Sequence, residues 1–455
     1  MLKKNLWTIL FTFILIVISF YQIKSIGDFR LDDSYITFSF SKNLSLGNGP
    51  VYSHDLKVEG YSNFLWMTLV AGAMKIAPQT DVYLLARILM LPFMLLLFGA
   101  TFKLTRSLSS LSFFSGISLT LLALSSDIFA AAVVCLETIP YTALLILAFS
   151  LYFEDSKNRW TLPILVAAAL MRIDGFIPLF FFCAFAWFHT NEKKKWIIRS
   201  IPSLLVYCLW FMWRWEYYGF LFPNTYYAKS QIHTILPNRG YEYAVASLKS
   251  TGFLAALPLI IYMIIKNRNY KTVFSLLFIT LHIFYVIHVG GDWMPFERFF
   301  IPILPIIFSL MSAGACEMIK SLRNFNWIQK SPFIAFSLMS FLFIGIFSCR
   351  FFINTNEEKG KIDFIQLQKY HVQINLVETA KLFSLLIKPG EKLFPTMRVL
   401  LRILQKLMLL ICGACVILKL LTEVLPLVFH LFMGSHVQSA TLKNNLSFSI
   451  QLTPS

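Results

Sequence analysis

Long apolar segments recur along most of the chain, and short polar segments separate them. The first covers residues 6–24, and the apolar pattern continues as far as residue 349. Runs of this length and composition are typical of helices that cross a membrane. The later predicted spans are 83–103, 110–126, 140–153, 196–212, 252–265, 272–289, 299–319 and 333–349. The pattern predicts an all-α polytopic membrane protein with about 11 to 13 transmembrane helices.

Three segments depart from this pattern. Residues 64–74 are apolar but short for a crossing, which predicts a half-inserted helix at the membrane surface. Residues 34–44 mix apolar and polar positions and predict an amphipathic surface helix. Residues 160–188 predict two short helices, because the charged sequence 171–175 interrupts them. Such a break at membrane depth must be buried in protein or face water.

The distribution of basic residues sets the predicted orientation. The formal net charge is +17, but the lysines and arginines cluster in short loops between apolar segments. This is the positive-inside pattern, so it predicts a cytoplasmic N-terminus and gives little weight to nucleic-acid binding. No small-residue cleavage site follows residues 6–24, so we interpret them as an uncleaved span. The predicted outer face then carries the polar segments 27–62, 127–138, 172–175, 213–250, 288–298 and 350–396.

Composition supports a membrane protein and narrows its chemistry. Hydrophobic residues make up 57% of the chain and charged residues 14%, well below the proportion usual in soluble domains. The sequence has no P-loop, HExxH or GxSxG motif. The seven cysteines lie mostly in apolar segments, where they act as small hydrophobic residues. The familiar sites of soluble enzymes are therefore excluded.

Asp32 and Asp33 follow the first span and are the strongest candidates for catalysis. Adjacent carboxylates can act as a general base or bind a metal ion, and crowding raises the pKa of one of them. The structural alternative is that they cap the helix that follows, since Asp suits that position. One Asp can cap while the other does chemistry. We expect at least one of them to be catalytic.

Other polar groups on the predicted outer face are candidates for substrate binding. Glu59 and Asn63 precede the half-inserted helix and can contact a sugar, or Asn63 can cap that helix. Glu137, Arg172 and Asp174 are ionisable groups at or near the membrane, which marks them as functional candidates. Their structural alternative is an ion pair of Arg172 with Asp174 or with Glu137.

Two further segments combine cations with aromatic and hydrogen-bonding residues. The first runs from Arg214 to Lys229, whose cations can bind a phosphate unless they only anchor an interfacial aromatic belt. The second is a glycine-containing turn at 288–298, where Asp292 and Arg298 can contact sugar and phosphate or simply stabilise a hairpin. The substrate-binding candidates from these two segments are Arg214, Asn224, Tyr227, Lys229, His288, Asp292 and Arg298.

Several of these segments, taken in order, resemble one family. The matching segments are Leu31-Asp32-Asp33-Ser34-Tyr35, Glu59-Gly60-Tyr61-Ser62-Asn63, Leu136-Glu137-Thr138, Arg172-Ile173-Asp174-Gly175, Pro223-Asn224-Thr225-Tyr226-Tyr227-Ala228-Lys229 and Gly290-Gly291-Asp292-Trp293-Met294-Pro295 with Arg298. Together they look like the GT-C membrane glycosyltransferases of the terminal arabinofuranosyltransferase (AftB-like) group, which includes LphB-like proteins. The similarity covers roughly residues 1–394.

The resemblance implies a GT-C fold with a catalytic first periplasmic loop at residues 27–62 and juxtamembrane helices. It implies a multi-pass protein of the bacterial inner membrane that takes a polyprenyl-phosphate sugar donor. The sugar would pass to a cell-envelope glycan or glycolipid, such as lipopolysaccharide, on the periplasmic side. The family's catalytic acidic pair falls on Asp32 and Asp33. No cofactor is required by this reading, although a divalent cation held by Asp32, Asp33 and Asp292 is an open alternative.

The chain also departs from the family. The usual Ser-Gly-Leu-Glu of the third motif reads Val134-Cys135-Leu136-Glu137, and Ile173 stands where the fourth motif has proline. We expect a transmembrane catalytic core at 1–350, a periplasmic segment at 351–396 and an atypical hydrophobic C-terminus with a polar tail at 397–455. The family has a soluble periplasmic part there, so our hypothesis is that this C-terminus is altered.

Two other functions stay open at this point. A transporter or lipid flippase would place charged or helix-breaking sites near the middle of the membrane, and the break at 172–175 is the one segment that suggests this. An inactive GT-C relative that serves as a scaffold is the second alternative, because the C-terminus departs from the family pattern. The clustering of acidic and basic segments on one predicted face favours the enzyme.

Overall fold

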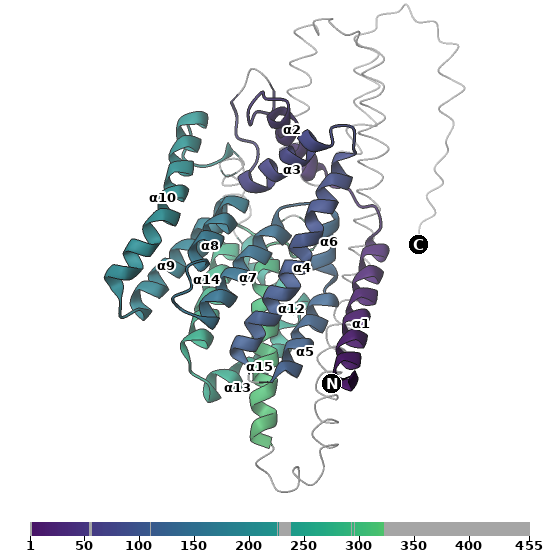
Figure 1. Cartoon of the computed structure of the whole chain (residues 1–455), viewed down its shortest axis with the longest axis vertical. Helices are drawn as coiled ribbons and strands as arrows, with labels where there is room; N and C mark the ends of the chain where they lie inside the picture. Colours follow the sequence, from purple (N-terminus) through teal and green to yellow (C-terminus); the bar gives the residue numbers. More distant parts are fainter. Residues whose placement is uncertain are drawn as a thin grey trace, which may run out of the picture. The chain divides into compact units, whose positions relative to one another are not determined.

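The computed structural model describes residues 2–53, 57–109, 111–224, 226, 238–292, 294 and 296–322, which all lie in the first of two compact units, Met1–Glu378. Regular structure in these residues is helical, with no strand among them. The elements in chain order (Figure 1) are α1 (Leu2–Ile26), α2 (Asp32–Ser45), α3 (Phe64–Ile76), α4 (Val82–Leu108), α5 (Ser112–Ala123), α6 (Ser126–Val133), α7 (Thr138–Glu154), α8 (Thr161–Met171), η1 (Ile173–Gly175), α9 (Phe176–His189), α10 (Lys193–Tyr218), α12 (Arg239–Ser250), α13 (Phe253–Lys266), α14 (Tyr270–His288), η2 (Ile301–Ile303) and α15 (Leu304–Leu322).

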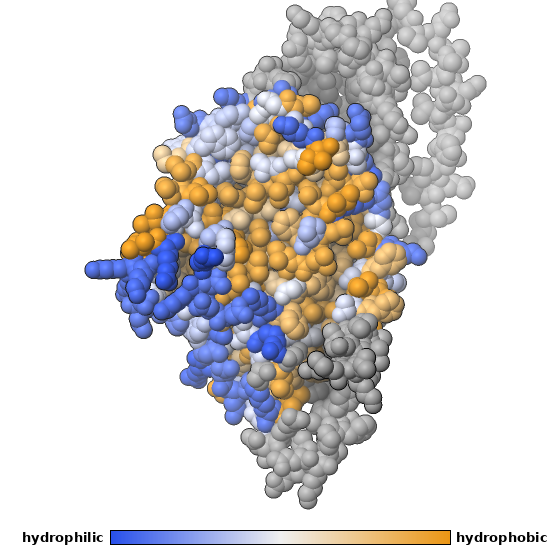
Figure 2. All heavy atoms as spheres, in the orientation of Figure 1, coloured by the Kyte–Doolittle hydropathy of each residue, from blue (hydrophilic) through white to orange (hydrophobic). Residues whose placement is uncertain are grey.

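Four helical segments in the described part are long and apolar enough to cross a membrane. They are α4, α10, α14 and the segment Ile301–Ser321, and the α5–α6 pair, bent by 57°, adds a fifth if it forms one span. Their outward surfaces carry large apolar side chains, and Figure 2 shows a broad hydrophobic face between hydrophilic ends. Such a face is stable in lipid. The predicted all-α polytopic class is confirmed, whereas the span at 333–349 and the segments 351–396 and 397–455 lie outside the described residues.

The helical core is built around α4, α7 and α15. Helix α4 packs along α7, α7 packs against α8, and α15 packs against α4, α5 and α13. A Cβ atom on Gly314 would lie 2.2 Å from the backbone oxygen of Leu259, so glycine permits the close approach of α15 and α13. The hydroxyl of Thr105 lies 2.8 Å from the hydroxyls of Ser118 and Ser309, which joins α4, α5 and α15. Small residues and hydroxyls therefore hold this core together as they do in membrane bundles.

The structure contains the predicted break within 160–188 and the two predicted short helices. The segment 160–188 forms α8 and α9, and the chain breaks at Arg172, whose backbone is extended (φ −144°, ψ 139°). The predicted short helices at 34–44 and 64–74 are α2 and α3. The segment 213–250 was expected to be a polar loop, and this is wrong in part. Helix α10 continues to Tyr218, and 239–250 form α12, which packs against α14. A Cβ atom on Gly240 would lie 2.0 Å from the backbone oxygen of Ile287, so glycine permits this close approach.

Candidate functional site

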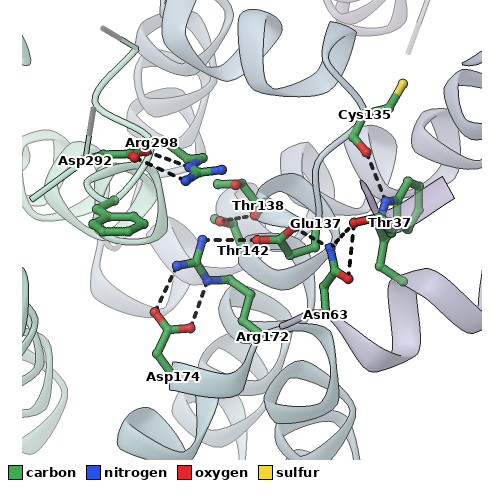
Figure 3. A network of polar contacts seen from close by, with 12 residues as sticks. Thr37, Asn63, Cys135, Glu137, Thr138, Thr142, Arg172, Asp174, Asp292 and Arg298 are labelled. Carbon is green, nitrogen blue, oxygen red and sulfur yellow. Dashed lines mark hydrogen bonds and ion pairs between the residues drawn. The ribbon is translucent and has the colours of Figure 1, made fainter. Parts of the chain in front are cut away.

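A continuous network of polar side chains links α2, α3, α7 and the α8–α9 break (Figure 3). The amide of Asn63 donates to the hydroxyl of Thr37 at 3.1 Å and to Glu137 Oε2 at 2.9 Å. Glu137 Oε1 in turn lies 3.5 Å from Arg172 Nη1. Glu137 is 6% exposed and Arg172 8% exposed, so both charges are buried and paired. Three candidates from the sequence analysis, Asn63, Glu137 and Arg172, thus form one chain of contacts.

Arg172 also pairs with Asp174, its neighbour in the break between α8 and α9. Its Nε and Nη2 each donate to a carboxylate oxygen of Asp174 at 2.9 Å, and the hydroxyl of Tyr285 donates to Asp174 Oδ2 at 2.7 Å. This two-point geometry fixes the plane of the guanidinium. Its remaining nitrogen, Nη1, is buried and has no hydrogen-bond partner among the described residues. The sequence analysis left open whether Arg172 pairs with Asp174 or with Glu137, and the structure shows contacts with both.

Arg298 brings a second buried cation to the same place. Its Nε and Nη2 donate to Asp292 at 2.7 and 3.2 Å. The ring of Phe299 lies 5.2 Å from the Arg172 guanidinium and 5.5 Å from that of Arg298. One aromatic ring therefore contacts both cations, which is favourable in a desolvated setting.

Three carboxylates, one of them from the acidic pair, act on the charge of Arg298. Burial acts to lower the pKa of Arg298, but the negative charges of Asp292, Glu137 and Asp33 outweigh it and raise the pKa above its ordinary value. Arg298 therefore remains a cation. The same interaction shows that Asp33 lies within electrostatic reach of this network, although it is 265 positions away in the sequence.

The two carboxylates of the acidic pair have different environments. Asp32 is exposed at the first position of α2, and its Oδ1 accepts a hydrogen bond from the backbone N–H of Asp33 at 2.9 Å. The N-cap position of α2 is Leu31 and no side chain caps the helix, so the capping alternative is wrong; both carboxylates lie in the first turn, where the helix dipole favours negative charge. Asp33 is half-buried. The start of α2 is fixed by Leu31, which exchanges two 2.8 Å hydrogen bonds with the hydroxyl of Tyr83, and by Ser34, which donates to the carbonyl of Val134.

Glu59 and Arg214 form a separate buried ion pair. Arg214 Nε and Nη2 donate to Glu59 at 2.9 and 2.6 Å, and Arg214 Nη1 donates to the carbonyl of Leu221 at 2.8 Å. The backbone N–H of Asn224 donates to the carbonyl of Glu59 at 3.2 Å. Arg214 was expected to bind a phosphate, but each of its guanidinium nitrogens is already bonded within the protein. The geometry instead supports a structural role that holds the first polar loop against the end of α10.

The remaining candidates are less central to the network. His288 is exposed at the end of α14, while Tyr227 and Lys229 lie outside the described residues. Two polar residues of α14 that the sequence analysis did not single out belong to the site. Tyr285 binds Asp174, and His282 Nε2 lies 2.7 Å from the carbonyl of Phe299. The sequence could have indicated them, because His282 and Tyr285 are three positions apart and so lie on one face of an otherwise apolar helix.

An unusual backbone conformation precedes Glu137. Cys135 has φ +59°, a left-handed conformation that favours glycine. Its carbonyl accepts a 3.0 Å hydrogen bond from the indole N–H of Trp66, which is fully buried. The turn that presents Glu137 therefore has a backbone conformation at position 135 that suits glycine better than other residues. Here a cysteine occupies it.

The expected alternative of a divalent cation has little geometric support. No group of three or more His, Cys, Asp or Glu side chains is arranged to hold a metal ion in the part of the chain that the structure describes. The carboxylate of Asp292 is engaged by both Nε and Nη2 of Arg298. The residues present therefore suit charge stabilisation by guanidinium groups rather than by a resident metal ion.

Comparisons with known proteins give a limited likeness. No protein-family model matches the chain, and no curated protein matches it. Two crystal structures of ArnT from Cupriavidus metallidurans are similar at 11% sequence identity. For ArnT bound to undecaprenyl phosphate the TM-score is 0.47, with 68% of this chain and 60% of that chain covered. For apo ArnT the TM-score is 0.44, with 71% and 62% covered. The chain thus spans about 60% of the ArnT length.

Proposed function

We propose that this protein is a membrane glycosyltransferase of the GT-C type. It transfers a sugar from a polyprenyl-phosphate donor to a hydroxyl of a cell-envelope glycan or glycolipid. The observation that carries the proposal is the cluster of two buried guanidinium groups, Arg172 and Arg298, on the ring of Phe299, next to helical segments that can cross a membrane. The negative charge of Asp33 acts on Arg298 in this cluster. The ordered sequence motifs that contain these residues resemble the same class of enzyme.

The two cations suit the leaving group of this reaction. Breaking the bond between the sugar and the phosphate leaves negative charge on the phosphate oxygens. Fixed, buried guanidinium groups stabilise such charge because they need no rearrangement during the reaction. Arg172 Nη1 lies 3.5 Å from Glu137 Oε1 but forms no hydrogen bond among the described residues, so its N–H groups supply a donor for a phosphate oxygen. Asp174, Glu137 and Asn63 hold Arg172 in place.

Asp33 is the proposed general base. It takes the proton of the acceptor hydroxyl while the acceptor oxygen forms its bond to the anomeric carbon of the sugar, and polyprenyl phosphate departs from the other side. Because Asp32 is exposed and bonded to the first turn of α2, Asp33 is the better placed of the two. A retaining route, in which the carboxylate attacks the sugar, uses the same residue.

The basic loops support the proposed orientation of the protein in the membrane. The proposed site lies at the start of α7 and the end of α8, whereas Lys157, Arg159 and Lys193–Lys195 lie near the opposite ends of α7 to α10. Placing those cations in the cytoplasm puts the site on the periplasmic side of the inner membrane and the N-terminus in the cytoplasm. A lipid-linked donor in the outer leaflet then carries its phosphate at the depth of the site.

The test is turnover of a panel of polyprenyl-phosphate sugars by the purified protein in lipid nanodiscs, with release of polyprenyl phosphate followed by mass spectrometry. Release that depends on the protein and on one sugar supports the proposal and names the donor. The counter-test places the protein in sealed proteoliposomes with a labelled lipid-linked sugar. Movement of that lipid between leaflets without any release would instead support a flippase.

A further inference from the structure

A second pocket lies at the other end of the helices that build the proposed catalytic site. It sits between the α7–α8 loop and the start of α10, and its polar lining includes Lys157, Asn158, Arg159, Thr190, Arg199 and Ser200. Helix α7 connects the two sites. It begins at Thr138, directly after Glu137, and ends at Glu154, two positions before Ser156 of this pocket. A helix of 17 residues is about 25 Å long, so the pocket is separate from the catalytic site.

The lining of this pocket is suited to an anion. Lys157 and Arg159 come from the α7–α8 loop, and Arg199 comes from the second turn of α10. Among the described residues that line it, Glu192 is the opposing carboxylate, and its Oε1 already lies 3.3 Å from Lys157 and 3.5 Å from Lys195. The hydroxyl of Thr161, also in the lining, is buried without a hydrogen-bond partner in the described chain. Cations and hydroxyl donors together are typical of phosphate recognition.

The surroundings of the pocket place it at the level of lipid headgroups. Arg159 lies 5.4 Å from the ring of Trp160, an indole that is 56% exposed. Trp187 and Trp196 lie with their ring centroids 6.1 Å apart on either side of the α9–α10 turn. Tryptophan is enriched where a membrane meets water. Figure 2 shows the hydrophilic surface at the α9–α10 end directly beside the broad apolar face.

We propose that this pocket binds the phosphate of an anionic membrane phospholipid, such as phosphatidylglycerol, from the leaflet opposite the catalytic site. Basic pockets between membrane helices are suited to anionic headgroups. Free inorganic phosphate has the same recognition chemistry, but the exposed indole of Trp160 and the adjoining apolar face favour a lipid. The bound lipid holds the α7–α8 loop and α10 together at the end where their lysines and arginines repel one another.

The experiment measures lipid retention by native mass spectrometry. Purified protein in a neutral detergent is titrated with phosphatidylglycerol or with phosphatidylcholine. The pocket variant carries Arg159→Gln and Arg199→Gln. The matched control carries Lys193→Gln and Lys194→Gln, which removes the same charge from the same end but outside the lining. A third variant, Ser156→Trp, adds bulk at the lining of the pocket without changing its charge. Thermal unfolding confirms that each variant is folded.

The expected result is a preference for phosphatidylglycerol that the pocket variant weakens by at least roughly tenfold, since it removes two charge-assisted contacts to the phosphate. Ser156→Trp gives a similar loss. The control changes retention by less than about threefold, because exposed charges outside the lining make no hydrogen bond to the phosphate and are screened by salt. Equal losses in the pocket and control variants, or no preference between the two lipids, would overturn the proposal. So would displacement of the lipid by millimolar inorganic phosphate, because the ligand would then be the free anion.

Discussion

Arg214 and Glu59 lie 155 positions apart in the chain, yet their side chains form a two-point ion pair with contacts of 2.9 and 2.6 Å. The side chains are 1% and 4% exposed. Close by, the hydroxyls of Tyr61 and Tyr218 lie 3.0 Å apart, and Tyr218 also donates to the carbonyl of Pro50 at 2.7 Å. The first polar loop is therefore tied to the end of α10 at two points.

Glu59→Gln is predicted to destabilise the protein by about 3–5 kcal/mol, because it leaves the guanidinium of Arg214 buried without its carboxylate. The measurement is unfolding of the detergent-solubilised protein by heat or denaturant. The matched control is Glu154→Gln, which breaks the 2.6 Å contact with Lys103 between side chains that are 58% and 35% exposed. That exposed pair is worth less than about 1 kcal/mol. Equal losses in the two variants would contradict the structural role of Glu59.

Phe299→Leu is predicted to cost roughly 2 kcal/mol of stability, because the ring contacts both Arg172 and Arg298 in a desolvated setting. If the proposed function is right, the variant should also bind polyprenyl phosphate several-fold more weakly, since both guanidinium groups lose a fixed neighbour. Phe180→Leu is the control, because Phe180 is 68% exposed and remote from the cations. If Phe299→Leu binds the lipid phosphate as the wild type does, the ring does not position these arginines.

Cys135→Gly is predicted to stabilise the protein by about 1 kcal/mol, because a left-handed backbone conformation costs a non-glycine residue about that much. Unfolding measurements on the same scale as above provide the test. Cys316→Gly, in the buried part of α15, serves as control and should destabilise the protein, since glycine weakens a helix and the packing around the thiol is lost. A loss of stability in Cys135→Gly would show that the thiol contributes more than the strained turn costs.

The loss of stability at acidic pH is predicted to depend in part on Asp28. Burial acts to raise its pKa, but the hydrogen bond and charge of Arg87 and the charge of Arg30 outweigh burial and hold the pKa below the usual 3.8. A lowered folded-state pKa stabilises the protein above the unfolded pKa, and that contribution is lost as the pH falls towards the folded pKa. Asp28→Asn and Arg87→Gln should each flatten the fall in melting temperature between about pH 5 and about pH 3. Because Asp28 is half-exposed, the effect is small.

Much of the architecture was predictable because membranes impose strict rules on sequence. Apolar length marked α4, α14 and α15, and charge at membrane depth marked the break between α8 and α9. Helix α12 was not predicted because its buried face is made of small residues, Gly240, Ala244 and Ser247, rather than an apolar stripe.

The sequence predicted which residues belong to the candidate site better than it predicted which of them pair with one another. Glu137, Arg172 and Asp174 stood out as ionisable groups near lipid, and the pairing of Arg172 was correctly limited to the other two. The partner of Arg214 was not predictable, because Glu59 lies in a distant segment and charge alone does not choose among several carboxylates. Phe299 carried no signal in a chain with 46 phenylalanines.

The most direct test of the proposed chemistry compares Asp33→Asn with Asp32→Asn in the same nanodisc assay with a donor that the wild type turns over. General-base catalysis contributes about 100-fold or more to rate, so Asp33→Asn should slow release of polyprenyl phosphate by at least about that factor while donor binding is retained. Asp32→Asn should slow it by less than about tenfold, since Asp32 is exposed and bonded to the first turn of α2. Release by Asp33→Asn at the wild-type rate would contradict the assignment of Asp33 as the base.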